Sequence, residues 1–176
     1  DSTIDNRVAA LEDRDVSMFF GDDMLTSNVV VSNTIVETTL YETNIPANSI
    51  TTPTMFELYV SGVYGTANSS DTFTVRIKMN DIEVYSFTSV PKNVTDTPVQ
   101  LTSTATIRTT GATGIFVSNA TFKALNDSLL GSSTASGNIN TTINNNIKVT
   151  MEWGSANVSN SGTIHQGILK IHGNKG

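Results

Sequence analysis

Phe73-Thr-Val-Arg-Ile-Lys-Met79 is the stretch that decides the fold, because apolar and polar side chains alternate in it at every position. A period of two places successive side chains on opposite faces of a strand, one buried and one exposed to solvent. The same alternation recurs in residues 147–153 and, over a longer run, in residues 99–107. Asn80-Asp81 is a turn signal, so residues 71–88 are predicted to form a β-hairpin.

Serine, threonine and asparagine dominate the composition and support the same prediction. The 176 residues contain 19 Ser, 27 Thr and 18 Asn. Threonine favours half-exposed strands, whereas serine, asparagine and glycine favour turns. We therefore predict an all-β fold, an antiparallel β-sandwich of the jelly-roll kind without a long interior helix. The nine predicted strands cover residues 28–33, 35–43, 54–64, 71–80, 82–88, 98–109, 114–124, 147–153 and 163–172.

Length and charge exclude several classes of protein. At 176 residues one domain is expected, because most domains hold about 50 to 250 residues. The net charge of −6, with 15% charged residues, argues against nucleic-acid binding, which uses clustered Lys and Arg. No apolar run approaches the ~20 residues of a transmembrane helix, so no membrane insertion is expected. The absence of cysteine excludes disulfides and thiol chemistry.

The N-terminal segment has a helical period instead. Ile4, Val8 and Leu11 are spaced four and then three residues apart, so they share one helical face. With Val8 at heptad position a, Leu11 falls at d, Arg7 at g and Glu12 at e, and a g residue pairs with the e residue of a neighbouring chain. This pattern predicts a coiled-coil stalk. The alternative is a single amphipathic helix packed on its own domain.

The run Arg7-Val8-Ala9-Ala10-Leu11-Glu12 resembles the short trimerisation motif of three-stranded coiled coils. The resemblance implies a homotrimer, in which the Arg stem packs along the apolar seam and its head meets the Glu of the next helix. Asp15 occupies the next a position, so the heptads end near Arg14. A helix this short is marginal alone, so the head is expected to carry much of the trimer contact.

Met18, Phe19 and Phe20 follow the stalk directly. We interpret these three side chains as an apolar plug where the chains enter the head, with ordinary core packing as the alternative. The predicted organisation is therefore a coiled-coil stalk end at residues 1–16, a linker with the plug at 17–27 and a β-sandwich head at 28–176.

No catalytic or metal-binding pattern is evident. His165 and His172 lie seven residues apart, on opposite faces of a regular strand, and neither has a spaced partner for zinc. The aspartates near turns lack the spacing of a calcium-binding EF-hand, and no Gly-x-Ser-x-Gly motif occurs. We therefore predict a protein that is not an enzyme and has no cofactor.

A charged heptad followed by a Thr- and Asn-rich β head resembles the trimeric fibres and receptor-binding proteins of tailed bacteriophages. Residues 37–48, 56–65 and 71–78 carry the similarity. The resemblance implies a jelly-roll or tumour-necrosis-factor-like knob on a virion surface that attaches to carbohydrate or protein of the host cell. Two alternatives stay open: a structural head fibre that decorates the virion without binding a receptor, and a lectin-like secreted module.

Binding is expected in loops, because loops tolerate change while a rigid sandwich holds them in place. The loops predicted for this role are 65–71, 89–97, 110–114 and 131–146. The last is of low complexity, with a plain linker as its alternative, and a helical turn at 125–131 is expected to precede it. The candidate binding residues are Asn68, Asn93, Thr113, Asn138, Asn140 and Asn144.

Overall fold

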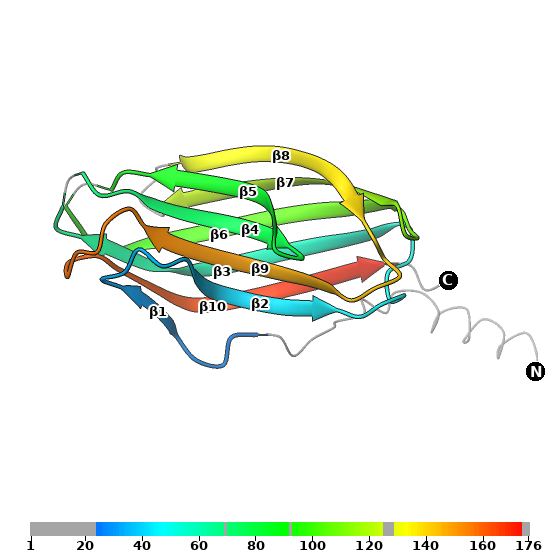
Figure 1. Cartoon of the computed structure of the whole chain (residues 1–176), viewed down its shortest axis with the longest axis horizontal. Coiled ribbons are helices and arrows are strands. Elements are labelled where there is room, and N and C mark those ends of the chain that lie inside the picture. Colours follow the sequence, from blue (N-terminus) through cyan, green and yellow to red (C-terminus); the bar gives the residue numbers. More distant parts are fainter. Residues whose placement is uncertain (1–23, 69, 92, 125–128, 174–176) are drawn as a thin grey trace, which may run out of the picture.

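The computed structural model describes residues 24–68, 70–91, 93–124 and 129–173, which form two antiparallel β-sheets packed face to face (Figure 1). The larger sheet has the order β1-β10-β3-β6-β7-β8 and the smaller one the order β2-β9-β4-β5. The predicted antiparallel sandwich is therefore confirmed. The strands are β1 (Val29–Ser32), β2 (Thr38–Ile45), β3 (Thr54–Thr66), β4 (Phe73–Met79), β5 (Ile82–Ser89), β6 (Val94–Thr109), β7 (Gly114–Ala124), β8 (Leu129–Ile139), β9 (Asn145–Trp153) and β10 (Ser161–Gly173).

The two stretches with the clearest alternation lie side by side in the smaller sheet. Strand β4 pairs with β9 in the register Phe73 to Trp153 and Ile77 to Val149. Their apolar side chains are buried between the sheets, whereas Arg76 and Lys78 reach the outer face. The predicted hairpin is present as β4 and β5, joined by Asn80 and Asp81, which both have positive φ. Asparagine and aspartate tolerate this conformation better than most residues.

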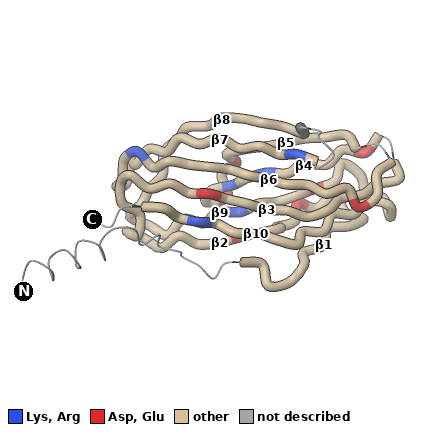
Figure 2. The backbone as a smooth tube through the Cα atoms, turned by 180° about the vertical axis from the view of Figure 1, so that it is seen from behind, with Lys and Arg blue, Asp and Glu red and all other residues tan. Residues whose placement is uncertain are grey.

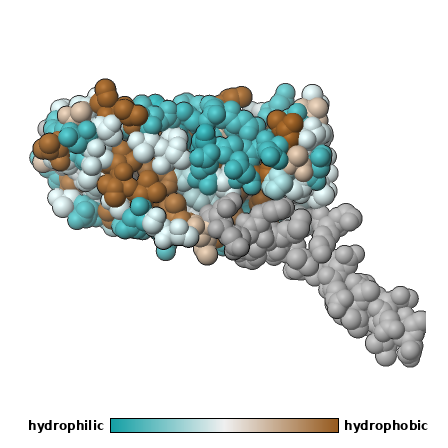
Figure 3. Space-filling model, turned by 60° about the horizontal axis from the view of Figure 1, so that its bottom comes forward, coloured by the Kyte–Doolittle hydropathy of each residue, from teal (hydrophilic) through white to brown (hydrophobic). Residues whose placement is uncertain are grey.

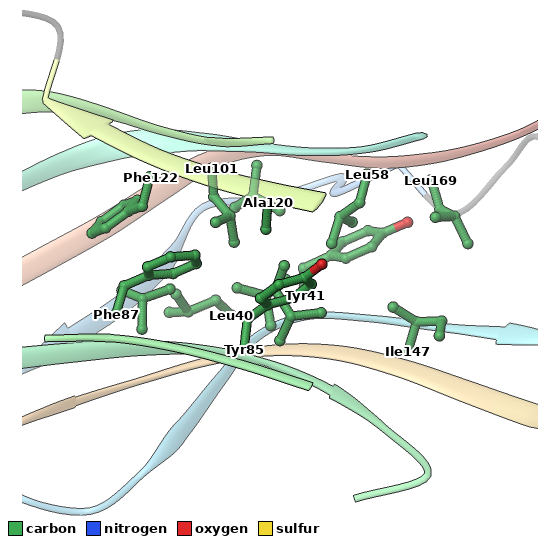
Figure 4. Close-up of a cluster of buried hydrophobic side chains, with 14 of the residues drawn as sticks. Leu40, Tyr41, Leu58, Tyr85, Phe87, Leu101, Ala120, Phe122, Ile147 and Leu169 are labelled. Carbon is green, nitrogen blue, oxygen red and sulfur yellow. The ribbon is translucent and has the colours of Figure 1, made fainter. Parts of the chain in front are cut away.

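Large side chains from both sheets fill the space between the layers (Figure 4). Phe73 lies at the centre of an aromatic cluster, with ring centroids 4.8 Å from Tyr64, 5.7 Å from Phe122 and 5.6 Å from Trp153. Offset and edge contacts at such distances stabilise beyond area burial alone. These rings come from four different strands, so the cluster ties the two sheets together.

Strand β8 corrects the prediction of a loop at 131–146, and it includes residues 129–131 of the predicted helical turn, whose residues 125–128 lie outside the described part of the chain. Residues 129–139 form a strand at the edge of the larger sheet, and only residues 140–144 connect it to β9. A Cβ added at Gly131 would lie 2.3 Å from Cδ1 of Phe87, and one at Gly137 would lie 3.1 Å from Cε1 of Phe116. The strand passes so close to these rings that only small residues fit at Gly131 and Gly137. The sequence of β8 therefore lacks the alternation of large apolar and polar residues that indicates a strand.

Two further predictions change. Strand β6 begins at Val94, so the predicted loop 89–97 shortens to a connection at residues 90–93. Strand β10 has a bulge between Ile164 and Gln166, which breaks the regular alternation used to place the two histidines on opposite faces.

The predicted stalk and plug lie outside the described residues. The stalk residues are Ile4, Arg7, Val8, Leu11 and Glu12, and the plug residues are Met18, Phe19 and Phe20.

Candidate functional site

The structure separates the predicted binding residues instead of bringing them together. Asn68 and Asn93 lie in the β3–β4 and β5–β6 connections at one end of the sandwich. Thr113, Asn140 and Asn144 lie in connections at the opposite end, and Asn138 belongs to strand β8 rather than to a loop. These residues therefore do not form one binding site.

Three of these asparagines accept hydrogen bonds from loop residues, Asn68 and Asn140 within their own loops and Asn144 from the β2–β3 connection. The side-chain oxygen of Asn68 accepts hydrogen bonds from the backbone N–H of Ser70 at 3.0 Å and from its hydroxyl at 2.9 Å. Asn140 accepts the same two bonds from Thr142, and the Asn144 oxygen accepts the backbone N–H of Ala47 at 2.9 Å. Asparagine commonly stabilises turns in this way, so the pattern of asparagines reflects loop geometry.

A better candidate lies on the outer face of the larger sheet, where two hollows adjoin. One, of about 440 Å³, covers β6, β7 and β8, and the other, of about 520 Å³, covers β10, β3 and β6. Thr104 lines both of them, so the two hollows meet at this residue and together form one depression. We call this depression the sheet hollow; its polar lining includes Thr104, Thr106, Asn119, Thr134, Ser136 and Gln166.

The strand register explains why hydroxyl groups gather in the sheet hollow. Thr104 pairs with Asn119 on β7, and Asn119 pairs with Thr134 on β8. On the other side Thr104 pairs with Glu57 on β3, and Glu57 with Lys170 on β10. Side chains in register share a face, so the row crosses five strands, a distance of about 19 Å at the usual strand spacing.

Several polar groups in this row are free to bind a ligand. The side chains of Thr104, Asn119 and Thr134 make no hydrogen bond to another described residue, and Ser103 contacts Asn119 only at its backbone carbonyl. Tyr59 lies in the next row, half-buried, with Ile168 as its register partner on β10. A tyrosine in this position offers a flat apolar ring with a polar hydroxyl at its edge.

Charge is sparse on this face (Figure 2). Lys170 and Glu57 line the β10 side of the hollow, and Nε2 of His172 lies 3.2 Å from a carboxylate oxygen of Glu57. The part of the hollow over β6, β7 and β8 has no charged lining residue. No group of three His, Cys, Asp or Glu in the described part of the chain is arranged to hold a metal ion.

The outer face of the smaller sheet is different, because its charged side chains pair with one another. Arg76 contacts Glu83 at 3.0 Å and Glu152 at 2.6 Å, and Lys78 contacts Glu37 at 2.6 Å. These pairs are partly exposed, so each stabilises the fold only modestly. Because the charges are already neutralised locally, we interpret this face as structural.

Two neighbouring groups stabilise the charged form of the Glu37 carboxyl. Hydrogen bonds from Lys78 and from the Thr150 hydroxyl lower the pKa of the Glu37 carboxyl below its ordinary value. The stabilisation is therefore present above the unfolded-state pKa and lost as the pH falls through the folded-state value. We expect urea unfolding at pH 7 and pH 3 to show a smaller acid-induced loss of stability in Glu37→Gln than in the unchanged chain. An equal loss in both would contradict this role.

Comparison with known proteins identifies no family. No family profile and no curated protein matches the chain. Among solved structures, the chain is similar to the CBM2 module of an evolved Dit from Lactobacillus casei BL23 phage J-1, with 13% identity, a TM-score of 0.41, and coverage of 77% of this chain and 69% of that one. It is also similar to a Lotus tetragonolobus seed lectin, with 10% identity, a TM-score of 0.38, and coverage of 84% and 94%.

A third solved structure is an enzyme. The chain is similar to the family 18 polysaccharide lyase aly-SJ02, with 8% identity, a TM-score of 0.37, and coverage of 85% of this chain and 90% of that one. In the part of the chain that the structure describes, no helix has the length and hydropathy of a membrane span.

Proposed function

We propose that the chain is a non-enzymatic attachment head that binds a carbohydrate of the host-cell surface in the sheet hollow. The observation that carries the proposal is the depression around Thr104, in which the side chains of Thr104, Asn119 and Thr134 make no hydrogen bond to another described residue. Binding sites are concave and combine apolar surface with a few polar groups that fix orientation. The sheet hollow has this combination, in Tyr59 and Ile168 beside the row of Thr and Asn side chains.

Sugar chemistry suits this lining. A saccharide presents many neutral hydroxyl groups and an apolar ring face. Thr hydroxyls both donate and accept hydrogen bonds, and the Asn119 amide does the same with two donors and one acceptor oxygen. An aromatic ring such as that of Tyr59 supplies a flat surface for the sugar ring. Nucleic acid fits poorly, because the hollow lacks the clustered cations that phosphates need.

The same proposal places three copies of the head on a virion fibre. Its support is the heptad pattern in which Val8 and Leu11 form the seam while Arg7 and Glu12 pair between chains. Three identical heads bind a glycan-coated surface more tightly than one, because the second and third contacts form at high effective concentration. A weak single site is therefore sufficient for attachment.

Glycan-array binding and cell adsorption with the purified full chain test the proposal. We expect Tyr59→Ala and Thr104→Val to weaken binding of the captured glycan at least tenfold, or about 1.4 kcal/mol. Thr39→Val is the matched control, because Thr39 is exposed on β2 of the other sheet and lies outside the hollow. The control is expected to bind like the unchanged chain.

Three outcomes would contradict this function. Failure to bind either glycans or cells favours the structural head fibre, which decorates the virion without a receptor. Unchanged glycan binding by Tyr59→Ala and Thr104→Val would show that the sheet hollow is not the binding site. Shortening of the glycan during the incubation, seen by chromatography, identifies an enzyme instead of a binding protein.

A further inference from the structure

Two uncharged segments come together along the edge of the sandwich at β1. Residues 24–36 and residues 154–164 contain no Asp, Glu, Lys or Arg among their 24 residues. With 15% charged residues in the whole chain, about four would be expected, and depletion of charge is typical of the core of a protein interface. Strand β1 pairs with the start of β10, and the Asn33 N–H donates to the Asn160 carbonyl at 3.2 Å, so the segments are neighbours.

Exposed apolar side chains concentrate on the same segments. Of the nine large hydrophobic side chains that are exposed among the described residues, five belong to this edge. Val158 is 87% exposed and Val36 is 66% exposed. Figure 3 turns the β1 side forward and shows hydrophobic surface gathered there. We call this surface the β1 edge patch; its members are Met24, Val30, Ile35, Val36 and Val158.

The β1 edge patch extends onto the outer face of the larger sheet. Val30 pairs with Thr163, which pairs with Val63 on β3, and Val63 pairs with Pro98 on β6. This row is uncharged from end to end. Single exposed apolar side chains are ordinary, whereas a continuous group of them marks an interaction surface.

We infer that the β1 edge patch is the surface through which the heads of the homotrimer contact one another, an inference that rests on the trimer of the proposed function. The predicted heptads end near Arg14, and the chain reaches the patch at Met24. Ten residues span at most about 35 Å, so three chains gathered at their stalks hold the Met24 ends of their three patches within that distance of the stalk end. The head contact then forms at high effective concentration.

The absence of charge fits a second copy as the occupant. Identical charges on three copies close to a shared axis would repel one another, and an uncharged apolar surface avoids this cost. Burial of the exposed aliphatic side chains supplies the attraction. The predicted stalk is too short to hold three chains together alone. A contact between the heads through the β1 edge patch would supply the additional stabilisation of the trimer.

Sedimentation velocity of the full chain over a concentration series tests the inference. The variant carries Val36→Glu together with Val158→Glu, and the control carries Ile82→Glu, since Ile82 is 72% exposed on the β4–β5 hairpin, outside the patch. We expect the unchanged chain and the control to sediment as trimers. The double variant is expected to need at least a tenfold higher concentration to associate, and unchanged association would overturn the inference.

Cysteine labelling provides a second measurement, because the chain has no cysteine of its own. A single Val158→Cys is expected to react with maleimide at least tenfold more slowly than a single Ile82→Cys in the native protein, and equally fast in urea. Equal rates in the native protein would show that the patch is uncovered and would overturn the inference even if the chain is trimeric.

The outcomes separate the inference from the proposed function. If the unchanged chain sediments as a monomer, both the trimer of the proposed function and the contact through the patch are wrong. This holds even if the thiol of Val158→Cys reacts slowly, because residues 1–23 of the same chain could then be what protects it. Glycan binding depends on the sheet hollow instead, so the per-site affinity of the Val36→Glu, Val158→Glu variant is expected to match that of the unchanged chain. Loss of glycan binding in this variant would mean that the patch contacts the receptor, which also overturns the inference.

Discussion

Replacing Phe73 with alanine is expected to lower the free energy of unfolding by about 4 kcal/mol, the range for removing a buried phenylalanine. Phe73 is 1% exposed, and its ring contacts Tyr64, Phe122 and Trp153 with centroids 4.8 to 5.7 Å apart. Because these partners come from β3, β7 and β9, the cavity would open between the two sheets. The surrounding strands are held by their hydrogen-bonded ladders, so they can collapse only partly into it.

Urea unfolding followed by circular dichroism and by Trp153 fluorescence measures this loss. Ile82→Ala is the matched control, because Ile82 is 72% exposed on the adjoining strand β5. The control is expected to change the unfolding free energy by less than about 0.5 kcal/mol, as is usual for surface positions. A loss below about 1.5 kcal/mol for Phe73→Ala would show that the aromatic cluster does not hold the sheets together.

Asn160→Ala is expected to cost about 3 kcal/mol, because it breaks a buried polar network. Asn160 is 0% exposed, and its amide donates to Oδ2 of Asp71 at 2.8 Å and to the Ser155 carbonyl at 3.1 Å. Its side-chain oxygen accepts the Thr66 hydroxyl at 2.6 Å. Each buried polar group left without a partner costs about 1 to 3 kcal/mol, and more when it is charged.

A double-mutant cycle identifies the cause of this loss. Asp71→Asn removes the buried carboxylate that accepts the hydrogen bond from the Asn160 amide. The double variant is therefore expected to lose less unfolding free energy than the sum of the two single variants. The control is Asn157→Ala in the same connection, since the Asn157 side chain only caps the N–H and hydroxyl of Ser159. Costs that add within about 0.5 kcal/mol would rule out coupling between Asn160 and Asp71.

The network also explains how one end of the sandwich is held. Asp71 lies in the β3–β4 connection and Asn160 lies just before β10, and the Ser155 hydroxyl reaches Oδ1 of Asp71 at 2.6 Å. Loops that bury no large apolar side chain need such polar contacts to hold one shape. Nothing in the local sequence indicates the pairing of Asp71 with Asn160, because 89 residues separate them.

Most strands could be predicted because each carries its own signal. In residues 73–79 and 147–153, one face is buried and the other is solvated, and this produces alternation within a few residues. The hairpin at Asn80 and Asp81 is likewise local. Strand β8 lacked the signal because its inner positions are small, and they are small because the rings of Phe87 and Phe116 already occupy the space.

The candidate site could not be predicted by the same means. Thr104, Asn119 and Thr134 are ordinary as single residues in a chain with 27 threonines and 18 asparagines. They share one hollow only because β6, β7 and β8 pair in a specific register. The loop residues stay a prediction, and the sequence did not indicate that Asn68 and Asn140 use their side-chain oxygens within their own turns or that Asn144 accepts the N–H of Ala47.

The sequence by itself determined the all-β class, most strand positions and the paucity of charge, because alternation, turn residues and composition are properties of neighbouring residues. Only the tertiary structure decided the edge strand β8, the buried pair of Asp71 and Asn160, the sheet hollow and the β1 edge patch. Each of these depends on which distant segments lie next to each other. Which segments become neighbours follows from packing two sheets so that their apolar faces are covered. A short stretch of sequence does not contain this information.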